Sequence, residues 1–247
     1  MNRIIAGRQP VMEALRAGTQ IEKVVFLMGV HGKVIEDIKS LAQKKSVQVA
    51  EVARQEFRDL ASDATTQGVV ALVSPHRQSV ELGALLSIPG ERNQKGFLLI
   101  LDEIEDPHNL GALVRSAECA GVHGVIIPKH HSATLTSTVS KTSAGAVEHM
   151  AIAEVTNIVN TIRELKEKGY WIIGLDSTAE KKYSEVDYMT PTALVVGSEG
   201  KGIRRLVREH CDFLVKIPLY GKIASLNASV AGALVMYEVI KQRTTSS

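Results

Sequence analysis

The feature that most constrains the fold is a regular alternation of strand and helix patterns from Phe97 to the C-terminus. The strand-like segments are apolar at nearly every position, which is typical of a parallel sheet covered by helices on both faces. The alternation therefore predicts an α/β domain. The expected strands are Phe97–Asp102, Gly124–Pro128, Met150–Val155, Trp171–Asp176, Ala193–Gly197 and Phe213–Pro218. The expected helices are Leu110–Ala120, Thr138–Ala146, Asn157–Lys168, Arg204–His210 and Leu226–Gln242.

Three motif-like stretches lie at the ends of strands of this sheet. They are Asn109–Arg115 (NLGALVR), Val195–Gly202 (VVGSEGKG) and Ile217–Ala231 (IPLYGKIASLNASVA). Nucleotide-type ligands bind outside the carboxyl ends of parallel strands, which lie along one edge of the sheet. We therefore predict that the three stretches form one composite site.

The expected C-terminal helix begins with small residues, from Asn227 to Ala233. Small side chains let a ligand or another backbone approach closely, and a glycine such as Gly232 inside a helix costs about 1 kcal/mol relative to alanine. Contact with a ligand and tight packing within the fold are the two interpretations. Ser225 lies where the N-cap of this helix is expected.

Residues 1–77 carry shorter helix and strand patterns, which predict a small α/β domain. The expected helices are Pro10–Leu15, Lys33–Lys45 and Arg54–Ala61, and the expected strands are Val24–Leu27, Val47–Val52 and Val69–Val73. The periodicity then lapses and ends in the polar turn sequence Pro89–Lys95. We interpret residues 78–95 as a linker and residues 96–247 as the second domain.

Charge differs between the two parts of the chain. Residues 1–77 hold 11 Lys and Arg against 8 Asp and Glu, whereas residues 96–247 hold 16 against 17. The basic bias of the N-terminal part is consistent with nucleic-acid binding, and a dimerisation or stability domain is the alternative. Two cysteines make no disulfide framework, and the sequence shows no signal peptide and no apolar run of about 18 residues. We therefore expect a cytoplasmic protein that does not enter a membrane.

Other site chemistries have weaker support. The glycine-rich stretch matches neither GxxxxGK[ST] nor GxGxxG, so neither standard phosphate cradle is expected. Cys119 and His123 are four residues apart and His130 and His131 are adjacent, which is too little for a metal site, and neither cysteine has a partner that suggests a thiol nucleophile. Five basic residues near the motifs are candidates for RNA phosphates or for a solvated surface: Lys129, Lys141, Lys201, Arg204 and Arg205.

In combination, NxGxxxR, VGSEGKG and IP…SLNASVA resemble the three motifs of the SpoU (TrmH-type) RNA ribose 2′-O-methyltransferases, over Phe97–Arg243. The N-terminal GRQPVMEAL and QGVVALV are similar to the substrate-binding extension of the bacterial branch that methylates a guanosine ribose in 23S rRNA. The resemblance implies a SPOUT-type parallel-sheet domain with a trefoil knot, preceded by a small α/β RNA-binding domain. It also implies S-adenosylmethionine as cofactor, RNA as partner, and a homodimer through the catalytic domain.

The resemblance also assigns site residues. Because the sequence shows no carboxylate or His cluster at ligand spacing, we expect the cofactor to bind without a metal. The residues implied to bind the cofactor are Gly197, Gly200, Ile217, Leu219 and Leu226. Backbone groups around Gly197, Ile217 and Leu226 are implied to meet the adenine. The residues implied in catalysis are Asn109, Arg115, Glu199, Ser225 and Asn227. Ser225 and Asn227 are assigned to positioning near the methyl donor, with N-capping as the alternative for Ser225.

Arg115 is the position that the resemblance links to activation of the ribose hydroxyl. A guanidinium stays protonated, so we interpret Arg115 as gripping a neighbouring phosphate and stabilising alkoxide charge rather than as a base. An ion pair with Glu118 is the alternative. Asn109 is expected to cap the helix that carries Arg115, and Glu199 to orient Arg115 or to accept a hydrogen bond from substrate.

Two other functions remain open. Within the same enzyme class, the alternative is a ribose methylase that acts on tRNA or on an antibiotic-resistance site of rRNA. In a different class, the alternative is a non-catalytic RNA-binding module for ribosome assembly.

For the expected homodimer, four residues of the C-terminal helix share one face of that helix, which meets either the partner or the sheet of its own domain: Ala228, Ala231, Val235 and Val239.

Overall fold

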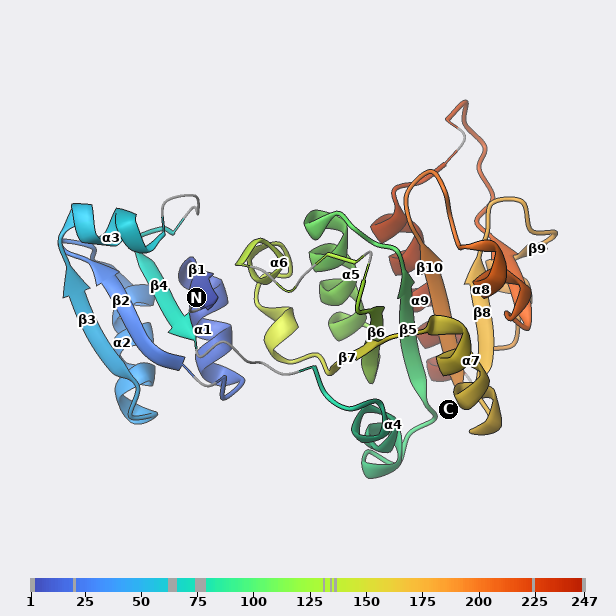
Figure 1. Ribbon diagram of the computed structural model, residues 1–247, viewed down its shortest axis with the longest axis horizontal. Helices are drawn as coiled ribbons and strands as arrows, with labels where there is room; N and C mark the ends of the chain where they lie inside the picture. The colour runs from blue at the N-terminus through green and yellow to red at the C-terminus, as the bar shows by residue number, and fades with distance from the viewer. Residues whose placement is uncertain are drawn as a thin grey trace. The chain divides into compact units, whose positions relative to one another are not determined.

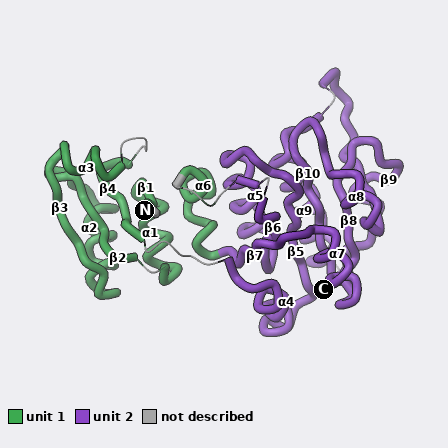
Figure 2. Tube along the Cα trace, in the orientation of Figure 1, with its two compact units in different colours: residues 1–78, 134–149 green, residues 79–133, 150–247 purple. Residues whose placement is uncertain are grey.

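The computed structural model describes residues 3–19, 21–61, 66–73, 79–130, 132–133, 135, 137–223 and 225–245. The chain divides into two compact units (Figure 2): unit 1 holds residues 1–78 and 134–149, and unit 2 holds residues 79–133 and 150–247. Unit 1 therefore takes up a segment from the middle of the predicted C-terminal domain.

Unit 1 contains a mixed sheet in the order β1-β4-β2-β3, in which only β2 and β3 are parallel. Its strands are β1 (Arg3–Ala6), β2 (Ile21–Leu27), β3 (Gln48–Val52) and β4 (Val69–Val73). Its helices within residues 1–78 are α1 (Arg8–Arg16), α2 (Lys33–Lys44) and α3 (Arg54–Leu60). The six elements predicted for residues 1–77 are confirmed, with shifted ends. The short strand β1 was not predicted, because four residues are too few to display a period.

The core of unit 1 has two sides, because successive strand residues point to opposite faces of the sheet. Val24 and Phe26 pack with α1 and α2, whereas Val25 packs with Phe57 of α3. The sheet is thus covered on both faces by helices, as expected for a small α/β domain.

Residues 134–149 complete unit 1 with α6 (Ser137–Thr142) and the 3-10 helix η1 (Ala146–Glu148). The buried Glu148 accepts a 2.7 Å hydrogen bond from the Thr19 hydroxyl. The predicted helix Thr138–Ala146 is interrupted, because Ala144 and Gly145 have φ values of 51° and 89°, outside the α-helical region. A Cβ at Gly145 would lie 2.5 Å from Cβ of Glu13 in α1, so this approach requires glycine.

Unit 2 contains an all-parallel sheet in the order β7-β6-β5-β10-β8-β11-β9. Its strands are β5 (Phe97–Asp102), β6 (Gly124–Pro128), β7 (Ile152–Val155), β8 (Trp171–Leu175), β9 (Lys181–Lys182), β10 (Thr192–Gly197) and β11 (Phe213–Lys216). The six predicted strands are confirmed, and every residue of β5, β6 and β10 is buried. The two-residue β9 was too short to predict.

Helices cover both faces of this sheet (Figure 1). They are α4 (Leu82–Glu91), α5 (Pro107–Cys119), α7 (Ile158–Glu167), α8 (Arg205–Glu209) and α9 (Ala228–Thr245). Residues of α4, α7 and α8 share one core cluster, and α9 packs against α5 and β10 on the other side. None of the helices that the structure describes is long and apolar enough to cross a membrane.

The C-terminal helix α9 packs tightly within unit 2. A Cβ at Gly232 would lie 2.6 Å from the Leu113 side chain of α5 and 3.4 Å from Val196 of β10, so tight packing explains this glycine. Val235 and Val239 are completely buried. Of the two alternatives for this face, the structure therefore selects packing on its own unit, and the dimer itself stays a prediction.

The interpretation of residues 78–95 as polar linker is wrong for their central part, which forms α4. Leu85 of this helix is completely buried, and a Cβ at Gly124 of β6 would lie 2.5 Å from its side chain. Pro89 and Gly90 suggested a break, but both fit in the last turns of the helix. The domain boundaries themselves stay a prediction.

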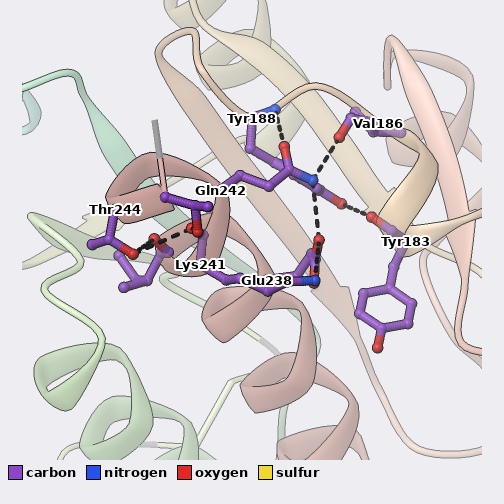
Figure 3. A network of polar contacts seen from close by, with 9 residues as sticks. Tyr183, Val186, Tyr188, Glu238, Lys241, Gln242 and Thr244 are labelled. Carbon is purple, nitrogen blue, oxygen red and sulfur yellow. Dashed lines mark hydrogen bonds and ion pairs between the residues drawn. The ribbon is translucent and has the colours of Figure 1, made fainter. Parts of the chain in front are cut away.

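A polar network fastens the end of α9 to the segment before β10 (Figure 3). The Gln242 side chain donates to the Val186 carbonyl at 3.2 Å and accepts from the Tyr188 N–H at 3.2 Å. The completely buried Tyr188 donates its hydroxyl to the Tyr183 carbonyl at 2.7 Å. Next to this network, Arg243 donates to four backbone carbonyls at 2.8 to 3.1 Å. The end of α9 is thus fixed, while passage of the last segment through a loop stays a prediction.

The burial of α4 predicts the effect of one substitution. Leu85→Ala should lower the free energy of unfolding by about 2 to 5 kcal/mol, because it leaves a cavity in a closely packed core. Leu206→Ala is the matched control, since Leu206 is 54% exposed, and it should change stability by about 0.5 kcal/mol or less. Urea denaturation of both variants measures this, and equal stabilities would contradict the assignment of α4 to the core.

Candidate functional site

A cavity of about 370 Å³ lies at the carboxyl ends of β8, β10 and β11 in unit 2. The five residues predicted to bind a cofactor all line it: Gly197, Gly200, Ile217, Leu219 and Leu226. Ala228 and Ala231 of α9 also line the cavity. The small residues at the start of this helix therefore leave room for the cavity as well as for tight packing. The edge of the sheet is thus where the second and third motifs meet.

Sequence reasoning missed Asp176 and Ser177, which also line the cavity. Both directly follow β8, and the rule that ligands bind at carboxyl strand ends would have identified them. The Asp176 carboxylate lies 2.8 Å from Nε of Arg208 and accepts 2.8 Å and 2.7 Å hydrogen bonds from the N–H and hydroxyl of Thr178. Its negative charge is therefore paired at the rim.

The glycine-rich stretch forms a tight turn that closes on itself. The Gly202 N–H donates to the Ser198 carbonyl at 2.9 Å. A Cβ at Gly197 would lie 2.1 Å from the Gly202 carbonyl carbon, so no other residue fits there without a backbone shift. Gly200 and Gly202 have φ values of 81° and 67°, in the left-handed region that glycine adopts readily. The turn brings its backbone, rather than bulky side chains, to the cavity.

Three side chains, one from each motif, meet in a hydrogen-bond network. Asn227 donates from Nδ2 to Oδ1 of Asn109 at 2.8 Å and to Oε2 of Glu199 at 3.2 Å. Asn109 donates from its own Nδ2 to Oε2 of Glu199 at 3.4 Å. The prediction of one composite site is confirmed in this respect, because the three stretches converge.

Both predicted N-caps are wrong. The cap of α5 is Asp106, whose carboxylate accepts from the N–H groups of His108 at 3.0 Å and Asn109 at 3.3 Å. The helix α9 begins at Ala228, and its first turn is capped by Oδ1 of Asn227, which accepts from the Ser229 N–H at 2.9 Å. Asn109 lies inside its helix, where its amide is directed to the network. Ser225 lines the cavity instead of capping.

Arg115 lies exposed on α5. Among the described residues it makes no hydrogen bond or ion pair, so neither the pair with Glu118 nor the contact with Glu199 forms. Glu199 accepts from two amide groups instead. The Arg115 guanidinium therefore keeps all its donors for a ligand.

A second hollow of about 260 Å³ shares Asn109 and Glu199 with the network. Acidic side chains dominate its lining, and Lys201 adds a single positive charge; the acidic residues are Glu103, Glu105, Asp106 and Glu199. Such a hollow favours a ligand that presents hydrogen-bond donors.

The described residues offer little for metal or thiol chemistry. Within them, no group of three or more His, Cys, Asp or Glu side chains is placed to hold a metal ion. Burial raises the pKa of the Cys211 thiol to about 12, so it stays protonated near neutral pH and is a poor nucleophile.

Comparison with known proteins matches both parts of the chain. The model of the SpoU rRNA Methylase family matches residues 96–237, and the model described as RNA 2′-O ribose methyltransferase substrate binding matches residues 4–79. A Bacillus subtilis protein assigned to the TrmH family of tRNA/rRNA methyltransferases, YacO, is 42% identical over 97% of this chain and 95% of its own.

Solved structures show the same fold. The SpoU methyltransferase AviRb of Streptomyces viridochromogenes, crystallised in complex with the cofactor AdoMet, matches with a TM-score of 0.81 and 23% identity. The match covers 98% of this chain and 90% of AviRb. A solved RNA 2′-O ribose methyltransferase matches with a TM-score of 0.80 and 25% identity, over 98% of this chain and 88% of the other.

The motifs, the parallel sheet and the composite site agree with these matches. The family model spans more than half of the chain, and the Bacillus relative spans nearly all of it. The chain belongs to the SpoU family of RNA methyltransferases.

Proposed function

We propose that the protein transfers a methyl group from S-adenosylmethionine to a ribose 2′-OH of RNA, with a guanosine of 23S rRNA in the cytoplasm as its target. The observation that carries the proposal is the network of Asn109, Glu199 and Asn227 beside the cavity. It joins the three motifs whose intact set argues against a non-catalytic assembly module. A tRNA or a different rRNA site is the alternative target.

The cavity suits S-adenosylmethionine in size and lining. Its volume of about 370 Å³ falls in the range of small-molecule sites. Apolar side chains such as Ile217 and Leu226 suit the faces of an adenine ring, and the turn after Gly197 brings backbone N–H and C=O groups to its edge. The crystallised complex of AviRb with AdoMet supports this choice of ligand.

Methyl transfer is an in-line displacement. Bound S-adenosylmethionine would supply an electrophilic methyl carbon: the ribose oxygen would form a bond to it as the carbon–sulfur bond breaks, S-adenosylhomocysteine would leave, and the hydroxyl proton would pass to solvent water. The enzyme aligns the two reactants and stabilises charge on the oxygen. Arg115 is the residue we assign to this stabilisation and to the grip on a neighbouring phosphate, because its donors are unpaired in the described part of the chain and its fork matches phosphate geometry. Ser225 and Asn227 are assigned to positioning near the methyl donor.

Two features support the choice of RNA target. We assign residues 1–77 to RNA recruitment and residues 96–247 to methyl transfer, a division that the separate matches to residues 4–79 and 96–237 support. The acidic hollow beside Glu199 suits a base that presents N–H donors. Guanine carries such donors on two adjacent atoms, N1 and N2, whereas uracil carries one on N3, which favours guanosine over uridine.

A homodimer through α5 and α9 completes the proposal. Exposed apolar residues of α9 share one helix face, since they are spaced by four and three positions: Val230, Leu234 and Tyr237. Together with Ser116 of α5 they line a hollow of about 320 Å³. Ser116 directly follows Arg115, so a partner on this face would lie beside a proposed catalytic residue.

The primary test is transfer of labelled methyl groups from S-adenosylmethionine to ribosomal RNA and tRNA, followed by mapping of ribose methylation in RNA from cells with and without the gene. We expect one rRNA guanosine to lose its 2′-O-methyl group in the deleted strain. Loss of a tRNA methylation instead would select the alternative, and an unchanged methylation map together with no transfer in vitro would overturn the proposal.

Arg115→Lys should lower turnover by about 100-fold, because lysine keeps the charge but lacks the planar fork. The affinity for S-adenosylmethionine should change little, since Arg115 does not line the cavity. Steady-state kinetics and calorimetry measure the two effects, with Arg205→Lys as a control on the surface of α8. Wild-type turnover in Arg115→Lys would show that charge alone suffices.

Tyr237→Asp should convert the dimer into a monomer, because it places a charge in the apolar face of α9. Tyr220→Asp is the matched control: Tyr220 is 96% exposed and lies outside that face. Light scattering at micromolar concentration compares the two variants. Identical masses for Tyr237→Asp and the wild-type protein would rule out this face as the interface.

A further inference from the structure

One buried carboxylate lies beside the glycine-rich turn. Asp102, the last residue of β5, is completely buried and pairs in register with Gly197, where the turn begins. Arg204 follows the turn, and its backbone N–H donates to Oδ2 of Asp102 at 2.8 Å. Its guanidinium donates from Nε to Oδ1 at 2.8 Å, and Nη2 lies 2.6 Å from the same oxygen. Asp102 therefore contacts the chain at both ends of the turn.

We infer that the pair of Asp102 and Arg204 positions the glycine-rich turn, and with it Glu199, for cofactor binding. The inference rests on the proposed function, because it concerns the same cavity. Both residues act through the turn: neither lines the cavity, whereas Gly197, Glu199 and Gly200 do. They are positioning residues rather than catalytic ones.

The glycine-rich turn is conformationally free enough that an ion pair at its end influences its backbone conformation. Its internal backbone bond joins Gly202 to Ser198, and its glycines have access to more backbone conformations than other residues. The network holds the turn through Glu199, near its middle. The Asp102–Arg204 pair holds the other end, where α8 begins, so the two together fix the path of the backbone along the cavity.

This assignment replaces a surface function for Arg204, which the sequence had placed among candidates for RNA phosphates. The Arg204 guanidinium pairs with two carboxylates, because Nη1 lies 3.4 Å from Oε1 of Glu103 in addition to the contacts with Asp102. The hydrogen bond to Asp102 raises the pKa of Arg204, which keeps the guanidinium charged. A phosphate would have to compete with both carboxylates, whereas the neighbouring Arg205 is 79% exposed and pairs with Glu209.

The test compares Arg204→Ala and Arg204→Lys with Arg205→Ala and Arg205→Lys in the full chain. Hydrogen exchange of the amides of residues 198–204 reports the order of the turn without any ligand. We expect the Gly202 amide to exchange at least about tenfold faster in Arg204→Ala, as local opening becomes easier, and Arg204→Lys to restore part of the protection. Neither substitution of Arg205 should alter exchange there.

Calorimetric titration with S-adenosylmethionine supplies the second readout. We expect Kd to rise about tenfold in Arg204→Ala, because the ordered turn that binds the cofactor falls to about a tenth of the population, and to stay unchanged in both Arg205 variants. If Arg204→Ala fails to fold, as judged by its thermal transition, Arg204→Lys against Arg205→Lys carries the comparison.

Equal exchange and equal affinity in the matched variants would overturn the inference. Failure of the proposed function gives a different result: the wild-type protein would not bind S-adenosylmethionine, while the exchange measurement would still report whether Arg204 orders the turn.

Discussion

The structure of the site depends on the carboxylate of Glu199. This side chain accepts hydrogen bonds from Asn109 and Asn227, which lie 90 and 28 residues away in the sequence. A carboxylate only accepts hydrogen bonds and an amide NH2 group only donates them, so both asparagines must turn their NH2 groups toward Glu199. Asn227 also caps α9 with its amide oxygen, which fixes the direction of its NH2 group. The starts of α5, α9 and the glycine-rich turn are thereby held in one arrangement.

The parallel sheet makes this convergence possible. Its central strands are buried along their whole length, so they are rigid supports whose carboxyl ends lie along one edge. Each motif starts at such an end and needs only a short loop to reach the others. The apolar sequence of the strands and the polar sequence of the loops therefore serve one purpose, which is the placement of a few amides and carboxylates beside a cavity.

The sequence predicted most of the strands correctly, because continuous apolar runs are a strong signal. It also placed the motif residues at the correct edge of the sheet, the one formed by the carboxyl ends of the strands. It missed α4, where Pro89 and Gly90 obscured a helix whose Leu85 is buried. It chose the wrong caps, since Ser225 and Asn227 are both good N-cap residues only two positions apart and propensity does not separate them. The pairing of Asp102 with Arg204 joins residues 102 positions apart, and a sequence without tertiary contacts carries no trace of it.

The composition of unit 1 from two separate pieces of chain has a consequence for biosynthesis. The backbone passes between the units three times, after residues 78, 133 and 149, so after a proteolytic cut at one passage the chain still crosses between the units at the other two. During translation, Thr19 emerges long before Glu148, the residue that accepts its hydrogen bond. The amino-terminal unit therefore completes its packing only after the ribosome has delivered β5 and β6 of the other unit, and the order of maturation differs from the order of synthesis.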